Sequence, residues 1–254
     1  MRGWDGRHCD FGWRWHSSRH RHQRGFSLTI SCAAGTAGVL ASGGTGIFIN
    51  AATTDVVTLR GFDIDGQGTG GAEVSIISAK SVHVENCTIR NFRNDSISAG
   101  IFFNSSVTIF LFVTNTVISD NYHGILFLSS AGFKVASLKN VTIAGSTSTG
   151  LFLNNPNVYV NVTKSIISGS GSIAVYLPAA STTVNIDRST IANNGAALQA
   201  LASGSTIRIS GNNIFNNTFG FFVGGGAQIQ TDNTNNTGGS NGGATVPNAS
   251  LAKN

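Results

Sequence analysis

The sequence predicts an all-β solenoid of about 7–9 stacked coils, each of roughly 25 residues. Three observations predict it. A repeat of that length runs through most of the chain, aliphatic residues stand two apart within each repeat, and no repeat holds a helical period of about 10–12 residues. Each unit then has three short strands and three turns. One coil cannot bury its inner face alone, whereas stacked coils can.

The repeat is anchored on an isoleucine that recurs at intervals of 25, 29, 25, 24, 24 and 23 residues. The anchors are Ile64, Ile89, Ile118, Ile143, Ile167, Ile191 and Ile214. The residues five and seven positions before every anchor are aliphatic, as in Leu59 and Val57. Residues two apart on a strand face the same side, so these columns should point inward and form the core.

Turn residues follow the same repeat. Two positions after the anchors stand Gly66, Asn91, Asp120, Gly145, Gly169, Asn193 and Asn216. Gly, Asn and Asp accept left-handed backbone angles or bond their own backbone, which predicts a turn there. A further strand opens each unit, and several of these strands begin on a glycine, as in residues 46–49, 100–103, 124–127 and 150–153. Three positions before three anchors stand Asn86, Asn115 and Asn140, whose amides we expect to stack along the solenoid.

The charge of the chain is concentrated at its start. The formal net charge is +5, and residues 1–26, which hold six Arg and two Asp, account for +4 of it. This segment is either a basic arm for nucleic acid or a disordered or non-native start, such as a mis-assigned N-terminus. We favour the second interpretation, because the segment has no apolar period and residues 27–254 are nearly neutral. We therefore predict no nucleic-acid partner.

The remaining chain divides into a solenoid over residues 27–230 and a flexible tail rich in Thr, Asn and Gly over residues 231–254. Residues 1–26 lack the apolar core of a signal peptide. No apolar run reaches the roughly 18 residues of a membrane span. The three cysteines are odd in number and show neither CxxC nor zinc spacing, so we infer no disulfide framework and no metal site.

The units resemble the right-handed parallel β-helix family, the pectate-lyase-like fold, over about residues 27–230. The resemblance is carried by the repeated Val-x-Val-x-Asn-x-x-Ile-x-Asn pattern, as in residues 82–91. The chain is most similar to secreted bacterial members of unassigned function. The resemblance implies right-handed coils and a secreted or cell-surface location. It leaves the activity open, because this fold hosts lyases, hydrolases and non-enzymes alike.

Few residues offer catalytic chemistry. The Asn-Thr-Asp, Asp-Asp and Gly-His-Gly motifs of polygalacturonase-like members are absent, as is the arginine-bearing motif of pectate-lyase-like members. Asp63 and Asp65 flank an inward isoleucine, so their carboxylates should lie about 6.5–7 Å apart on the outer face. That separation overlaps the lower end of the range of about 6.5–9.5 Å seen in inverting glycosidases. The candidate catalytic set is Asp63, Asp65, Glu73, His83 and Arg90.

Opposite charges on neighbouring strands favour a structural interpretation of the same residues. Asp65 shares a column with Arg90, and Arg60 shares one with Glu85, which predicts ordinary cross-strand pairs. The columns predict no charged partner for Asp63, since its column neighbour is Thr88. His123 is a lone histidine in a turn, which we expect to be solvated.

One outward column is apolar where polar residues are expected. It runs through Phe48, Ser75, Phe102, Leu126, Phe152, Tyr176, Gln199 and Phe222. We call its large apolar members, Phe48, Phe102, Leu126, Phe152, Tyr176 and Phe222, the aromatic stripe. Exposed apolar patches usually mark an interface or a ligand groove. Three explanations of the stripe are open. A terminal segment or a long turn covers it, it forms an interface between copies of the chain, or it stacks on the sugar rings of a glycan.

These observations predict a non-catalytic extracellular or cell-surface β-helix protein that binds glycan or self-associates through the stripe. The alternative is a polysaccharide lyase or glycoside hydrolase acting on an acidic polysaccharide. We expect no cofactor, and calcium enters only under the lyase alternative.

Overall fold

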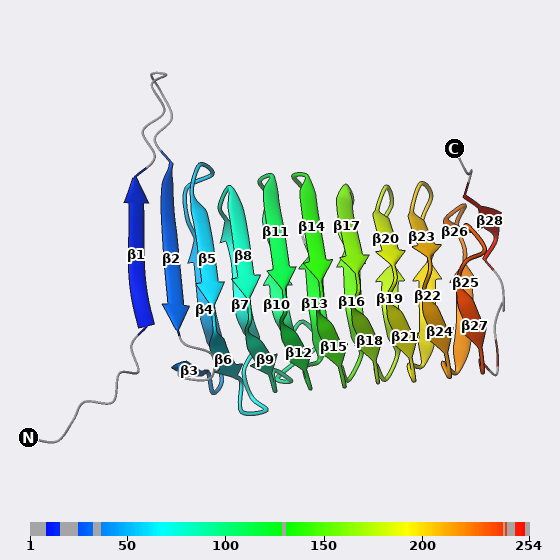
Figure 1. Ribbon diagram of the computed structural model, residues 1–254, viewed down its shortest axis with the longest axis horizontal. Coiled ribbons are helices and arrows are strands. Elements are labelled where there is room, and N and C mark those ends of the chain that lie inside the picture. Colours follow the sequence, from blue (N-terminus) through cyan, green and yellow to red (C-terminus); the bar gives the residue numbers. More distant parts are fainter. Residues whose placement is uncertain are drawn as a thin grey trace, which may run out of the picture.

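The computed structural model of the chain is a solenoid of short strands stacked in three sheets (Figure 1). It describes residues 9–15, 25–32, 37–128, 131–240, 242 and 247–251, without the side chains of residues 9–15, 37, 72 and 73. The described residues contain strands and turns but no helix. No helix there is therefore long and apolar enough to cross a membrane.

Successive strands of one coil belong to different sheets, and each sheet grows by one strand per coil. Sheet A consists of β1 (Cys9–Trp15), β2 (Phe26–Cys32), β5 (Val56–Arg60), β8 (Ser81–Glu85), β11 (Ile109–Thr114), β14 (Lys134–Lys139), β17 (Val158–Thr163), β20 (Thr183–Asp187), β23 (Thr206–Ser210), β26 (Gln228–Thr231) and β28 (Ala249–Ser250). Sheet B consists of β3 (Ala37–Leu40), β6 (Phe62–Asp65), β9 (Thr88–Arg90), β12 (Val117–Ser119), β15 (Thr142–Ala144), β18 (Ile166–Ser168), β21 (Thr190–Ala192), β24 (Asn213–Phe215) and β27 (Asn236–Gly238). Sheet C consists of β4 (Thr45–Asn50), β7 (Ala72–Ser78), β10 (Ala99–Phe103), β13 (His123–Leu128), β16 (Thr149–Asn154), β19 (Ile173–Leu177), β22 (Ala196–Ala200) and β25 (Phe219–Val223).

The predicted columns set the register of the stack. The anchor isoleucines pair with one another through sheet B, as in Ile64 with Ile89, and every one of them is at most 2% exposed. The aliphatic column of Leu59 and Val84 does the same in sheet A. Each buried aliphatic side chain contributes roughly 1.5–3 kcal/mol. The core is therefore a set of aliphatic ladders that runs the length of the solenoid, and the prediction of stacked β-helix coils is confirmed.

The turns behave largely as predicted. Asn91, Asp120 and Asn216 have positive φ angles of 64, 57 and 54°, and the other predicted turn residues except Gly66 share that conformation. Between sheets A and B, Asn86, Asn115 and Asn140 are also left-handed, with φ of 51 to 54°. Their amides form the expected ladder: Asn115 Nδ2 donates to Asn86 Oδ1 at 3.2 Å, and Asn140 Nδ2 to Asn115 Oδ1 at 2.8 Å.

The two ends of the chain carry more structure than the sequence pattern indicates. Residues 9–15, within the segment expected to be disordered or non-native, form β1, which pairs antiparallel with β2. Residues 1–8 and 16–24 lie outside the described residues. In the segment predicted to be a flexible tail, β27 and β28 add a strand each to sheets B and A.

The inference of no disulfide was wrong for one cysteine. Cys32, at the end of β2, is disulfide-bonded, and the residue opposite it in the antiparallel register is Cys9. Spacing along the sequence does not reveal this relationship, because it arises from a strand pairing outside the repeat. Cys87 is free and buried in the core, and burial raises the pKa of its thiol.

Candidate functional site

The predicted carboxylate pair is held by a single arginine on the outer face of sheet B. Arg90 Nη1 and Nη2 donate to Asp63 Oδ1 and Oδ2 at 2.5 and 3.1 Å, and Arg90 Nε donates to Asp65 Oδ2 at 3.1 Å. Asp65 Oδ1 also accepts bonds from the backbone N–H of Gln67 and from Asn91 Nδ2. Three of the four carboxylate oxygens therefore bind Arg90, and the fourth is bonded to neighbouring turn residues.

The pKa shifts of Asp65 and Arg90 agree with a stable ion-pair cluster. Burial pushes the pKa of Asp65 upward, but the hydrogen bonds from Asn91 and Gln67 and the charge of Arg90 outweigh it, so the pKa lies below its usual value. The pKa of Arg90 is raised, chiefly by its hydrogen bonds to Asp63. A general acid needs a raised carboxyl pKa and a nucleophile needs an accessible carboxylate. The lowered pKa of Asp65 does not suit a general acid, and both oxygens of Asp63 are engaged by Arg90.

The other predicted catalytic residues do not join this cluster. His83 lies on β8 in sheet A, where its ring stacks on Phe112 with centroids 4.7 Å apart. Burial lowers the pKa of His83. Glu73 lies on β7 in sheet C, and its side chain is outside the described residues. The catalytic set is therefore spread over three sheets, and the second predicted pair, Arg60 with Glu85, forms at 2.6 Å.

Metal ligands do not gather in the described part of the chain. No group of three or more His, Cys, Asp and Glu side chains there is placed to hold an ion.

The aromatic stripe lies in one register column of sheet C, but its members differ in exposure. Phe48 and Phe222 are 61% and 53% exposed, on the outermost described strands β4 and β25 of the sheet. Phe102, Phe152 and Tyr176 are half-buried. Phe152 and Tyr176 stack with centroids 5.1 Å apart and an interplanar angle of 13°. Such a stack covers one face of each ring.

Two sequence expectations near the stripe were wrong. Leu126 is only 1% exposed, because it lies in register between the larger Phe102 and Phe152. His123 is buried and not solvated: its Nε2 lies 3.1 Å from the carbonyl oxygen of Ser96, and its ring contacts Tyr122 and Phe152. Burial lowers the pKa of His123, which favours the neutral ring.

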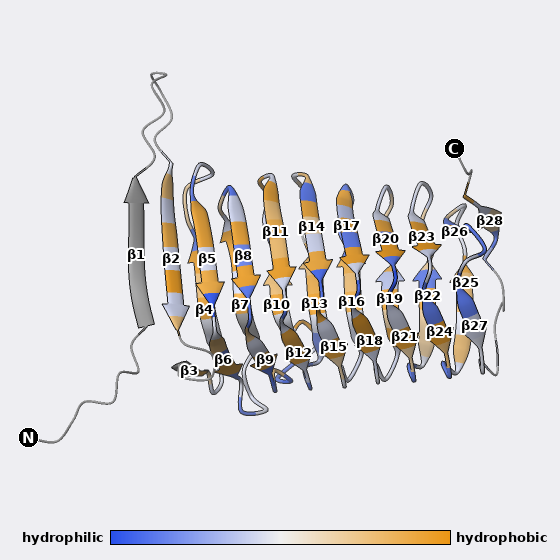
Figure 2. Ribbon diagram, viewed as in Figure 1, coloured by the Kyte–Doolittle hydropathy of each residue, from blue (hydrophilic) through white to orange (hydrophobic). Residues whose placement is uncertain are grey.

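A second aromatic surface, which the sequence analysis missed, lies on sheet A. Phe110, Phe112, Phe133 and Tyr159 are 38–43% exposed on β11, β17 and the turn before β14. We call these four residues the sheet A patch. Figure 2 shows β11 as largely hydrophobic, because Phe110 and Phe112 face outward between inward aliphatic residues. The signal was present in the sequence as aromatic residues at the polar positions of an alternating strand.

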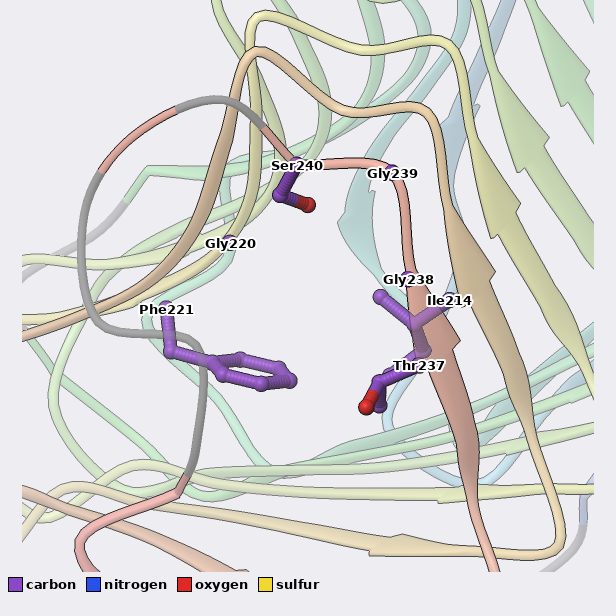
Figure 3. A pocket seen from close by; sticks show the side chains of 7 residues that line it. All are labelled: Ile214, Gly220, Phe221, Thr237, Gly238, Gly239 and Ser240. Atoms are coloured by element: carbon purple, nitrogen blue, oxygen red, sulfur yellow. The ribbon is translucent and has the colours of Figure 1, made fainter.

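A small pocket of about 100 Å³ opens near the C-terminal end of the solenoid (Figure 3). Its lining residues are Ile214, Gly220, Phe221, Thr237, Gly238, Gly239 and Ser240. The lining offers two hydroxyls and no titratable side chain, so it carries no catalytic chemistry.

Comparison with known proteins places the chain in a structural class. Residues 99–251 match the family model described as a right-handed β-helix region. The chain belongs to this family, and the prediction of right-handed β-helix coils is confirmed.

The solved structures add a distant likeness. A chain titled "Geobacillus virus E2 - ORF18" is 12% identical, with a TM-score of 0.44, over 82% of this chain and 51% of that one. The present chain thus spans about half the length of that viral protein. No curated protein matches.

Proposed function

We propose that this chain is a non-catalytic extracellular or cell-surface β-helix protein that binds glycan along the aromatic stripe. The observation that carries the proposal is the stripe itself: five aromatic side chains in one register column, each at least partly exposed. Aromatic side chains bring a large apolar surface with a specific geometry to recognition sites. Parallel strands place the column at regular steps of about 4.8 Å, which suits a polymer that lies along the solenoid.

The non-catalytic part of the proposal is supported by the ion pairs that the candidate carboxylates form. Arg90 forms ion pairs with both Asp63 and Asp65, and Arg60 binds Glu85. An extracellular location is supported by the disulfide of Cys32, since disulfides persist mainly in oxidising compartments.

Self-association is a second candidate, favoured by where the stripe is most exposed. Phe48 and Phe222 lie on β4 and β25, the outermost described strands of sheet C, whereas the middle of the stripe is half-buried. Contacts between copies through these two residues would cover the largest exposed members of the stripe.

The test uses the full chain with two double variants. Retention on a panel of insoluble neutral and acidic polysaccharides is measured for the wild type, for Phe102→Ser with Phe152→Ser, and for Phe48→Ser with Phe222→Ser. Glycan binding predicts that the central pair lowers retention at least tenfold. Self-association predicts that the terminal pair alone lowers the mass measured by light scattering.

Circular dichroism checks that each double variant keeps its strands. No retention and a monomer for the wild type would overturn both candidates. Turnover of any polysaccharide that Asp63→Asn abolishes would overturn the non-catalytic proposal in favour of a lyase or hydrolase.

A further inference from the structure

The sheet A patch offers an aromatic ring face beside small polar side chains. Phe112 stacks on His83 of β8 with an interplanar angle of 20°, so one of its faces is covered. The other face looks toward β14, where its register partner is Ser137. Ser137 is small and only partly buried. The half-exposed ring of Phe112 therefore has an open face above a hydroxyl.

A ring stacked on that face would lie about one strand spacing away, roughly 4.8 Å, and so directly over Ser137. The next residue in the column is Asn161 of β17. Its Oδ1 accepts a bond from Asn185 Nδ2 at 2.8 Å, which leaves its Nδ2 to donate on the side of Ser137. Sugar hydroxyls pair well with neutral donors and acceptors of this kind.

A positive charge lies beside the same position. Lys139 follows Ser137 by two residues on β14, so both face outward about 6.5–7 Å apart. Lys139 is exposed and forms no ion pair with any described carboxylate. The acidic residues on either side of it in the same sheet, Glu85 and Asp187, are bound by Arg60 and Arg188.

We propose that Phe112, Ser137, Lys139 and Asn161 form a binding site for a sugar ring that carries a carboxylate. The ring stacks on the open face of Phe112, its hydroxyls bond to Ser137 and Asn161, and its carboxylate pairs with Lys139. The site lies on sheet A and is independent of the stripe on sheet C.

The neighbours favour a glycan over a single-stranded nucleic acid. Nucleic-acid grooves track phosphates with many basic side chains, whereas this site has one free lysine. The column continues toward the C-terminus with two neutral amides, Asn161 and Asn185, and then with a single basic residue, Arg208, which donates to Asn185 Oδ1. The second exposed face in the patch, that of Tyr159, looks toward Thr183, again a hydroxyl.

The test compares two hexasaccharides that share ring geometry and differ in charge. Binding of β-1,4-linked mannuronate hexasaccharide and of mannohexaose to the full chain is measured by calorimetry at low salt. We expect mannuronate to bind at least tenfold more tightly, with the preference lost in 0.5 M salt, as surface charges are then screened. Phe112→Ser should weaken both ligands at least fivefold, and Lys139→Gln should weaken mannuronate alone.

Matched controls separate the site from general effects. Phe215→Ser removes an equally exposed phenylalanine from sheet B, and Lys80→Gln removes an exposed lysine from the opposite end of the sheet A strands. Neither should change affinity. Equal effects of Lys80→Gln and Lys139→Gln, or tighter binding of oligo(dT) than of mannuronate, would overturn the proposal. A loss caused by Phe102→Ser with Phe152→Ser but not by Phe112→Ser would support the stripe and reject the sheet A site.

Discussion

Arg90 binds Asp63 with both of its terminal nitrogens and reaches Asp65 with its third, so one side chain on β9 holds two carboxylates on β6. Without it, two like charges would face each other across Ile64. We expect Arg90→Gln to lower the free energy of unfolding by about 1 kcal/mol, a modest value because the three side chains remain partly exposed.

Urea denaturation at low and high salt measures the effect. Arg93→Gln is the matched control, since Arg93 makes one exposed ion pair, with Asp120. An Arg90 effect no larger than the Arg93 effect would argue against the two-carboxylate role.

The lowered pKa of Asp65 makes the same cluster sensitive to acid. Partial burial raises the pKa, but the bonds from Asn91 and Gln67 and the charge of Arg90 lower it further than burial raises it. A carboxyl whose folded pKa is depressed adds stability above its unfolded value of about 3.9, and this contribution is lost as pH falls through the folded value. We expect the stability gap between wild type and Asp65→Asn to be full at pH 6 and to close below about pH 4. Acid titration of both proteins followed by circular dichroism checks this, and a gap that persists at pH 2 would contradict it.

The repeat made the register predictable because each inward column has a fixed offset from its anchor, so that Leu59, Val84 and Ile64 could be placed without coordinates. Exposure on the outer face was less predictable. Leu126 and His123 are covered by neighbouring side chains and by the loop that carries Ser96. This burial depends on the path of the longer turns, which the repeat pattern does not describe. The ion pair between Arg90 and Asp63 was not predicted either. The column places Arg90 beside Asp65 and does not reveal that its side chain also reaches Asp63.

The asparagine ladder combines hydrogen bonds with a strained backbone. Asn115 has φ of 51° and bonds both to Asn86 below and to Asn140 above. We expect Asn115→Ala to lower the free energy of unfolding by about 2 kcal/mol, since it loses both amide bonds and puts alanine, which tolerates the left-handed conformation less well than asparagine, at this position. Asn115→Gly loses the bonds without the strain, so it should cost about 1 kcal/mol less. Denaturation curves for the pair separate the two causes, and equal losses would show that strain plays no part.

Glycine near the start of β10, β13 and β16 in sheet C has a steric cause. A Cβ on Gly124 would lie 2.3 Å from Ile143 Cγ2 and 2.5 Å from the carbonyl oxygen of Gly150. Because the backbone of the next coil cannot move aside without shifting the ladder, Gly124→Ala should destabilise the solenoid by about 2 kcal/mol or more. Gly44, which has no atom within 4 Å of the same position, is the control, and Gly44→Ala should be nearly neutral. Thermal denaturation that ranks the two variants in the opposite order would contradict this steric cause.

Lys134 occupies an inward position where its register partners are Ile109 and Val158. Its side chain is buried, and the partners of Nζ among the described residues are the carbonyl oxygens of Ala131 and Gly132 in its own turn. Burial therefore lowers the pKa of Lys134. A folded pKa below the unfolded one means that the unfolded chain binds more protons, so stability should rise with pH between the lowered value and about 10.4.

Replacement of Lys134 by methionine keeps the apolar stem and removes the buried charge. We expect Lys134→Met to raise the free energy of unfolding by about 1 kcal/mol or more at pH 7, and this gain should shrink as the pH rises toward 10 and the wild-type amine loses its charge. Lys139→Met, an exposed change on the same strand, should have little effect at either pH. Guanidinium denaturation of the three proteins at pH 7 and pH 10 tests the argument. A gain that is the same at both pH values would show that the charge of Lys134 is not its source.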